Sequence, residues 1–166
     1  HHTVAQLLIT GDDTTNDTRR FNFTNTLNRL LELGALPVIN ENDTVATDEI
    51  VIGDNDTLAA IVARSVHADM LILLSDIDGL YTADPHTHPE AALLHHVARV
   101  DDHIREIAGI SSSTQGTGGM VTKLHAADIC LGCGCKMVIA NGNNPGNLYD
   151  ILEGKTVGTT FSEERL

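Results

Sequence analysis

Apolar segments of strand length alternate with segments of helical periodicity along most of this sequence, and this alternation constrains the fold more than any other feature. Alternating strands and helices are typical of a parallel sheet joined by right-handed crossovers. We therefore predict an α/β fold, a three-layer α/β/α sandwich with a mainly parallel central sheet. The runs that predict the strands are Val4–Thr10, Leu36–Ile39, Met70–Leu74 and Lys136–Ala140, and those that predict the main helices are Arg19–Leu33, Asp56–Val66 and Met120–Leu131.

Shorter elements are predicted between and after these segments. We expect a small hairpin or extended excursion at Thr44–Ile52, irregular chain with short strands over 79–100 and a short helix at Asp101–Ala108. A helical turn at Asn147–Leu152 and a last strand at Gly158–Phe161 complete the pattern. No repeat, low-complexity tract or long linker interrupts it, so we expect one domain or one part of one.

Each of the four main strands runs directly into polar, turn-forming residues. In open α/β sheets, ligands bind beyond the carboxyl ends of the strands. Any fold of this class has some polar turns there, so one cluster alone indicates little. Four clusters predict that this edge of the sheet binds the ligand; they are Thr10–Asp12, Asn40–Asp43, Ser75–Asp76 and Asn141–Asn144.

Composition excludes several classes of protein. The 166 residues carry 10 basic and 23 acidic side chains, a net charge of −13, so the surface repels nucleic acid and anionic lipid. Apolar runs such as Met70–Leu74 are far shorter than the ~20 residues that span a bilayer. We expect neither nucleic acid nor a membrane among the partners.

Three cysteines lie together at Cys130, Cys133 and Cys135. An odd, clustered set is a poor disulfide framework, so a reducing cytoplasm is the expected location. Zinc bound by these thiols with His125 is an alternative, but small buried cysteines are the favoured interpretation. A second group of metal-ligand type is predicted to be solvated loop histidines instead: His86, His88, His95 and His96.

A glycine-rich segment, Gly116–Lys123, precedes and enters a predicted helix. Glycines let backbone amides approach an anion closely, and the positive end of the helix points the same way. Lys123 can then reach the charge on a transferring phosphoryl group. A loop that only turns the chain into the helix is the alternative, but Thr117 and Thr122 beside Lys123 favour phosphate binding.

Two polar clusters, Asn40–Asp43 and Gly53–Asp56, flank the short excursion. Such a density of carboxylates and amides suits an ammonium group or a divalent cation. Turn formation and helix capping explain Asp54 well, and Asp56 could equally complement a helix dipole from the surface. Ser75 and Asp76 follow a buried strand and are expected beside the phosphate loop.

Taken together, these residues resemble the amino-acid kinase superfamily and, within it, the glutamate 5-kinase family. The resemblance covers nearly the whole chain. The GTGGM-x-TK string alone leaves related kinases open, whereas PVINEND with GDND indicates glutamate. The matching strings are PVINEND (37–43), GDND (53–56), LLSDIDGLYTADP (73–85) and GTGGMVTK (116–123), with PG (145–146) and VGT (157–159) beyond them.

The resemblance implies transfer of the γ-phosphoryl group of ATP, with Mg²⁺, to the side-chain carboxylate of L-glutamate, the first step of proline biosynthesis. It implies that Asp43 and Asn55, together with Asn42, bind the amino acid. Asp56 is expected to orient the catalytic lysines, and Lys123 to stabilise the transition state. The nucleotide-binding residues it implies are Ser75, Asp76, Thr117, Gly118, Gly119, Met120, Val121, Thr122 and Lys123.

Two departures from the family pattern accompany the resemblance. Ser75 stands where the family usually has Thr, and the hydroxyl is kept. The family opens with a strand and a lysine-bearing glycine-rich turn, whereas this sequence matches the pattern from its middle onward. We expect residues 1–166 to be the C-terminal, ATP-binding part of one kinase domain, without the RNA-binding-type C-terminal domain of many members, and to be weak or inactive alone.

A missing strand would leave a sheet edge open, which predicts a homo-oligomer. Two alternatives to the glutamate kinase stay open. One is a sibling kinase whose acceptor is acetylglutamate, aspartate, carbamate or uridylate. The other is a nucleotide-binding module without activity.

Overall fold

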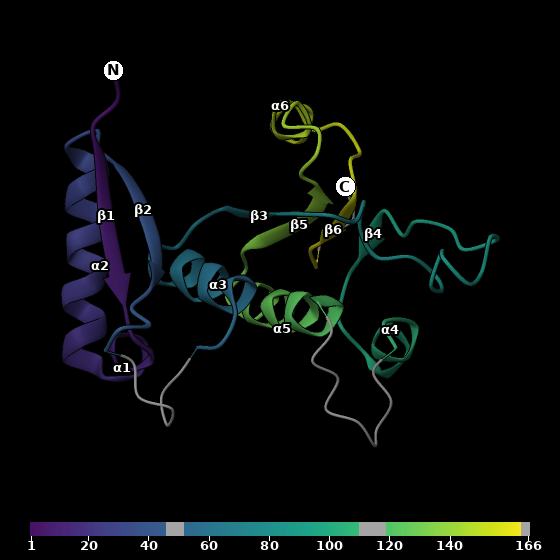
Figure 1. Cartoon of the computed structure of the whole chain (residues 1–166), viewed down its shortest axis with the longest axis horizontal. Coiled ribbons are helices and arrows are strands. Elements are labelled where there is room, and N and C mark those ends of the chain that lie inside the picture. Colours follow the sequence, from purple (N-terminus) through teal and green to yellow (C-terminus); the bar gives the residue numbers. More distant parts are fainter. Residues whose placement is uncertain (46–51, 110–118, 164–166) are drawn as a thin grey trace.

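A computed structural model of the chain describes residues 1–45, 52–109 and 119–163 and contains two separate sheets (Figure 1). The N-terminal sheet pairs β1 (Val4–Ile9) with β2 (Leu36–Glu41) in parallel. The second sheet has the order β3-β5-β6-β4. Its strands are β3 (Met70–Ser75), β5 (Lys136–Asn141), β6 (Thr159–Phe161) and β4 (His96–Val97).

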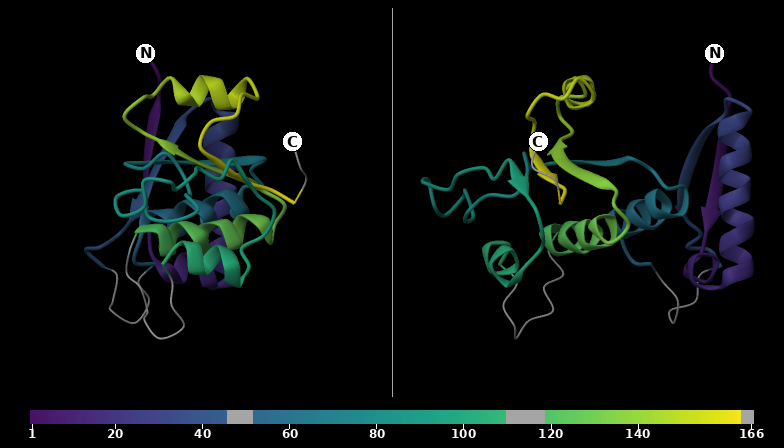
Figure 2. Two further views of the ribbon diagram at one scale, coloured as in Figure 1. Left: turned by 90° about the vertical axis from the view of Figure 1, so that its right-hand side faces the viewer. Right: turned by 180° about the vertical axis from the view of Figure 1, so that it is seen from behind.

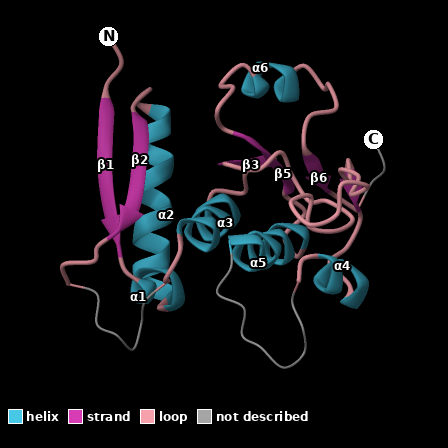
Figure 3. Ribbon diagram, turned by 45° about the vertical axis from the view of Figure 1, so that its right-hand side comes forward, coloured by secondary structure: helices cyan, strands magenta, loops and turns pink. Residues whose placement is uncertain are grey.

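Helix α2 (Asp17–Glu32) covers one face of the N-terminal sheet (Figure 3). The Asn16 side chain caps its start by accepting hydrogen bonds from two backbone amides, and the chain turns away at Gly34, whose φ of +69° favours glycine. Phe23 and Leu27 of α2 are buried against Ile9 of β1. The short helix α1 (Gly11–Thr15) joins β1 to α2.

The second sheet is covered on both faces. Strands β3 and β5 are parallel and β5 and β6 antiparallel. On one face, Met137 and Ile139 of β5 join the largest apolar cluster of the molecule, which α5 (Gly119–Leu131) also enters. On the other face, Val138 and Ala140 pack with Ile151 of α6 (Asn147–Leu152). Parallel strands are usually buried in this way.

Helices α3 (Asn55–Ser65) and α5 run side by side, as Figures 1 and 2 both show. Their contact is built on small residues that are fully or almost fully buried, so the two helix axes can approach closely. This packing brings the first turns of two helices, 64 positions apart from Asn55 to Gly119, to one side of the molecule. The small residues are Ala60, Ala63, Ala126 and Ala127.

The predicted α/β class with mostly parallel strands is confirmed. The short helix predicted at Asp101–Ala108 is α4 (Asp102–Ile107). Helix α1 was not predicted. The strands belong to two sheets, so the four polar turns do not share one continuous edge in the described residues. Most of the excursion predicted at Thr44–Ile52 lies outside those residues. None of the described helices is long and apolar enough to cross a bilayer.

Candidate functional site

A cavity of about 510 Å³ lies between the carboxyl end of β3 and the start of α5. Ser75 and Asp76 line it from β3, and the chain from Ile77 to His86 forms one wall. Gly119, Met120 and Lys123 line it from α5. The free backbone amides in the first turn of a helix, and its positive dipole end, make such a position favourable for an anion. The cavity therefore combines an anion-binding end with a cation.

Lys123 forms the central contact of the site. Its ammonium donates to Oδ2 of Asp56 at 3.1 Å and to the Gly119 carbonyl at 3.3 Å. The side chains of Lys123 and Asp56 are only 11% and 21% exposed, so solvent screens this ion pair less than a surface pair. The structure thus joins two predicted site residues that are 67 positions apart in sequence.

The local sequence of α3 explains the position of Asp56. Asp54 caps the helix by accepting from the Thr57 amide at 2.7 Å, which places Asp56 in the first turn. The Thr57 hydroxyl lies 2.8 Å from Asp54 and 3.2 Å from Nδ1 of His125 on α5. These polar contacts supplement the alanine packing and hold the start of α3 against α5.

Thr122 also contacts Asp56. Its hydroxyl lies 2.7 Å from Oδ2 of Asp56 and 3.0 Å from the Gly119 carbonyl. A hydroxyl has one proton, so it donates a hydrogen bond to one of these two acceptors at a time. Thr122 and Val121 are not among the residues that line the cavity, whereas Met120 is. The other two predicted phosphate-binding residues, Thr117 and Gly118, lie outside the described residues.

The residues predicted to bind the acceptor follow β2 and begin α3. Asp43 and Asn55 are exposed, and within the described chain no hydrogen bond joins either one to the Lys123–Asp56 pair. The backbone amide of Asn42 donates to the Ile9 carbonyl at 2.7 Å, and its side-chain oxygen accepts from the Thr44 hydroxyl. Among the described residues, Asn42 and Asp43 thus follow the end of β2 and Asn55 begins α3, and no hydrogen bond joins Asn55 to the other two.

Glu41 is a residue that sequence reasoning missed. Its carboxylate accepts from the Ile52 amide at 2.8 Å and from the Gly53 amide at 3.3 Å, across 11 and 12 positions. This contact ties the end of β2 to the segment that leads into α3. An acidic residue inside the polar cluster was the available signal, but only the fold shows that it bonds backbone amides.

A second hydrogen-bond network joins the ends of β3 and β5. Asp78 accepts from the side chain of Asn141 and from the Tyr81 hydroxyl, both at 2.9 Å. The hydrogen bonds from Asn141 and then Tyr81 lower the pKa of Asp78, and the same contact with Asp78 raises the pKa of Tyr81. The network braces the loop that forms the wall of the cavity.

The cysteine and histidine side chains that the sequence analysis considered as metal ligands contact other parts of the fold. Burial, with the nearby thiols of Cys135 and Cys133, raises the pKa of Cys130 to about 12, so Cys130 stays a protonated thiol. His96 bonds the Ser162 carbonyl at 3.0 Å and thereby connects β4 to the end of β6. No three His, Cys, Asp or Glu side chains gather as a metal site in residues 1–45, 52–109 and 119–163.

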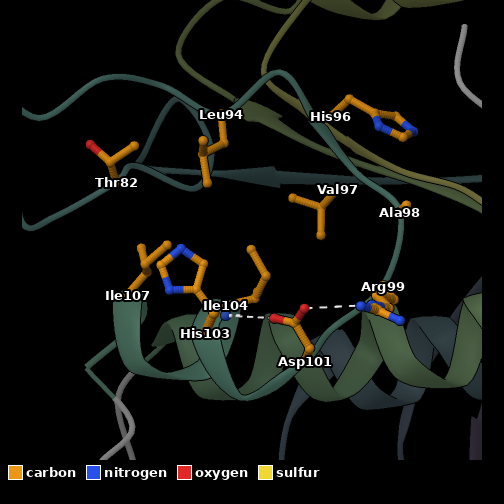
Figure 4. Close-up of a pocket in the computed structure, with 10 residues that line it drawn as sticks. All are labelled: Thr82, Leu94, His96, Val97, Ala98, Arg99, Asp101, His103, Ile104 and Ile107. Atoms are coloured by element: carbon orange, nitrogen blue, oxygen red, sulfur yellow. Dashed lines mark hydrogen bonds and ion pairs between the residues drawn. The ribbon is translucent and has the colours of Figure 1, made fainter.

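A further depression of about 420 Å³ lies between β4 and α4 (Figure 4). Figure 4 shows Leu94, Val97 and Ile104 around it and the ion pair between Asp101 and Arg99 at its rim. Hydrogen bonding to the Ile104 amide lowers the pKa of Asp101. None of the predicted site residues lines this depression.

The sequence is similar to known proteins over nearly its whole length. The pattern described as "Amino acid kinase family" matches residues 2–141. The chain is 50% identical over 158 residues to a protein named glutamate 5-kinase of Thermoanaerobacter sp. (strain X514), covering 95% of this chain and 42% of that protein. It is 55% identical over 156 residues to the protein of that name of Paramagnetospirillum magneticum, covering 93% and 42%.

Solved structures show the same fold. A UMP kinase from Bacillus anthracis superposes with a TM-score of 0.66 at 16% identity, covering 99% of this chain and 59% of that one. An isopentenyl phosphate kinase from T. acidophilum gives a TM-score of 0.65 at 20% identity, covering 96% and 60%. The chain thus spans 42% of the length of several curated relatives and about 60% of these solved chains.

Proposed function

Because this chain belongs to the amino acid kinase family, we propose that it forms the nucleotide-binding part of an enzyme that phosphorylates the side-chain carboxylate of L-glutamate with ATP. The proposal is supported by the identity of about half its residues to proteins named glutamate 5-kinase. The observation that carries it is the Lys123–Asp56 ion pair beside a cavity into which the first turn of α5 opens.

In the proposed reaction a carboxylate oxygen of glutamate attacks the γ-phosphorus of ATP. The bond from that phosphorus to the oxygen bridging the β- and γ-phosphates breaks, and ADP leaves with the bond electrons. The products are glutamyl 5-phosphate and ADP. Little covalent chemistry is required of the protein, so alignment and charge neutralisation supply the catalysis.

Lys123 is proposed to stabilise the negative charge that develops on the transferred phosphoryl group. Asp56 holds the Lys123 ammonium at the mouth of the cavity, and Thr122 holds Asp56. Ser75 and Asp76 line the same cavity and are proposed to contact the nucleotide. Asp43, Asn55 and Asn42 remain the proposed acceptor-binding residues.

The donor set fits a Mg²⁺ ion that arrives with the nucleotide. Mg²⁺ in phosphoryl-transfer sites is commonly held by one or two carboxylates and the substrate phosphates, and not by an all-protein cage. Asp76 supplies a cavity-lining carboxylate of that kind. When bound, Mg²⁺ would neutralise charge on the β- and γ-phosphates.

The decisive experiment traps the acyl phosphate. Residues 1–166 and the complete product of the gene are each incubated with MgATP, hydroxylamine and one acid, and the hydroxamate is measured. We expect hydroxamate from glutamate with the complete product. Hydroxamate only from another acid, such as aspartate or acetylglutamate, would assign a sibling reaction, and nucleotide binding without any turnover would indicate an inactive module.

Two variants and one control test the proposed roles. Lys123→Ala should lower kcat by about 10²–10³-fold, by analogy with removal of one oxyanion donor. Asp56→Asn should lower kcat and leave the Kd of MgATP nearly unchanged, because Asp56 acts through the lysine. Lys155→Ala is the matched control, since Lys155 is exposed and pairs with Asp150 away from the cavity. Equal losses for Lys155→Ala and Lys123→Ala would contradict the proposal.

Two further features are proposed with this function. A cytoplasmic location agrees with the cysteines, all three of which are free thiols. A homo-oligomer stays a prediction, to be checked by light scattering of the purified protein.

A further inference from the structure

Helix α4 separates two cavities. The cavity of about 510 Å³ at the start of α5 is also lined by Ile107 at the end of α4 and by Ala108 and Gly109, which follow it. The depression of about 420 Å³ beside β4 is lined by Ile104 and Ile107 from α4 (Figure 4). Ile107 borders both hollows, so α4 forms a thin wall between them.

Apolar packing holds this wall only loosely. None of the six residues of α4 is buried. Ile104 and Ile107, with Ala108 after the helix, are partly buried against the largest apolar cluster. Asp101 caps α4 by accepting from the Ile104 amide at 3.0 Å, but this contact is local and does not fix the helix relative to its neighbours. Elements with few buried side chains open at a low free energy, so the position of α4 depends on its remaining contacts.

An ion pair joins α4 to the helix that carries Lys123. The guanidinium of Arg105, in the last turn of α4, donates to Oδ2 of Asp128 on α5 at 2.5 Å, across 23 positions of sequence. Each side chain is 38% exposed, so solvent screens the pair only in part. Within residues 1–45, 52–109 and 119–163, no second ion pair connects α4 to another helix or strand.

The place of Asp128 on α5 connects the wall to the site. Asp128 follows Lys123 by about one and a half turns of the same helix. Gly119 and Lys123 line the cavity from α5, and Ile107 lines it from α4. The ion pair therefore sets the position of one wall of the cavity relative to the other.

We propose that Arg105 and Asp128 are positioning residues, which hold α4 in place as a wall of the cavity that binds MgATP. Neither side chain lines the cavity, so both act through the residues at the end of α4. Without the pair, the wall is free to shift towards the depression on its other side. The inference rests on the proposed function for the identity of the ligand.

The test measures the Kd of MgATP for the complete gene product by titration calorimetry without glutamate. Arg105→Met keeps the apolar stem and removes the charge, and Asp128→Asn keeps the shape. Each should raise Kd by about 3–5-fold, the range of a partly exposed ion pair. The double variant should lose about as much as either single one, because the two residues act as a unit. In the kinase assay kcat should stay within about twofold while KM rises, because Lys123 and Asp56 keep their contact.

Two controls separate the charge from packing and from general effects. At about 1 M salt the ratio of the variant Kd to the wild-type Kd should fall towards one, because the Debye length there is about 3 Å, whereas a loss of packing would leave the ratio unchanged. Arg29→Met is the matched variant, since Arg29 pairs with Glu32 on α2, far from α4 (Figure 1). It should bind MgATP as the wild type does.

Amide hydrogen exchange without nucleotide tests the position of α4 itself. In Arg105→Met the amides of α4 should exchange faster, and those of β5 should not change. Faster exchange in both elements would assign the pair a general structural role and overturn the positioning role. A wild-type Kd in Arg105→Met and Asp128→Asn would also overturn it and leave the proposed function intact. A wild-type protein that binds no nucleotide would instead refute the proposed function, and the inference with it.

Discussion

Strands β2 and β5 each have six residues and a parallel partner, but their surroundings differ sharply. In β5 the four central residues are buried, because α5 covers one face of the strand and α6 the other. In β2 exposed and half-buried residues alternate, because α2 covers one face only. The second sheet is therefore buried on both faces, whereas the N-terminal sheet keeps exposed apolar side chains on one face.

The glycines of the two regions provide the largest expected contrast. Gly158 precedes β6 with φ +65°, and a Cβ there would lie 1.9 Å from the Ile139 carbonyl. Gly34 follows α2 with φ +69° and has nothing within 4 Å of a Cβ. Gly158→Ala should lower the free energy of unfolding by about 3–5 kcal/mol through strain and overpacking, and Gly34→Ala by about 1–2 kcal/mol through strain alone. Urea unfolding measures both, and equal losses would show that the close approach of the Ile139 carbonyl to Gly158 adds no cost.

Buried threonines give the next contrast. The Thr159 hydroxyl accepts from the Leu80 amide at 2.8 Å and donates to the Leu94 carbonyl at 2.6 Å, so it joins distant segments of the second region. Within the described residues, the Thr14 hydroxyl donates to the Gly11 carbonyl of its own helix. Thr159→Val should cost about 1–3 kcal/mol, because it leaves a buried amide unpaired. Thr14→Val should lower the free energy of unfolding by less. Thermal unfolding of the two variants measures both losses, and the reverse order would contradict this expectation.

Shortening one side chain in each sheet tests how much burial of that side chain contributes to stability. Ile139 of β5 is fully buried, whereas Val38 of β2 is 50% exposed. Ile139→Val should lower the free energy of unfolding by about 0.5–1.5 kcal/mol, and Val38→Ala by less than about 0.5 kcal/mol in residues 1–166. Urea unfolding measures both variants, and a cost of Val38→Ala as large as that of Ile139→Val would contradict the difference in burial between the two strands.

The smallest effect concerns pH and the end of β5. Hydrogen bonds from Asn141 and Tyr81 lower the pKa of Asp78 in the folded protein. A lowered native pKa stabilises the fold above the unfolded value near 3.9, and this contribution disappears as the pH falls through the native pKa. Asn141→Ala should therefore raise the pKa of Asp78 towards its ordinary value, as seen by carboxyl NMR titration. An unchanged titration would show that the network does not act on Asp78.

Regular elements could be predicted from the sequence where apolar periodicity is strong. Met70–Leu74 is a continuous apolar run, and it forms β3 with one added residue. Helix α1 could not be found this way, because its five residues are polar or glycine. Its start depends on Asp13, whose carboxylate accepts from the Thr10 amide at 2.7 Å and from the Thr10 hydroxyl. A threonine followed three residues later by an acid was the available signal.

Strand pairing and site geometry were harder to predict. Local patterns do not specify which strands pair, so the division into two sheets was not foreseen. The contact of Lys123 with Asp56 depends on the close packing of α3 and α5, and the family resemblance, not spacing, connected the two residues beforehand. Glu41 was missed because its partners are backbone amides, which any residue offers.

Helix α3 packs with its buried side against both apolar clusters and carries Asp56 in its first turn. The carboxylate that pairs with the lysine ammonium is therefore anchored to the two regions of the molecule at once. A disturbance of either core would displace that carboxylate, so the charge pair at the site depends on the integrity of both.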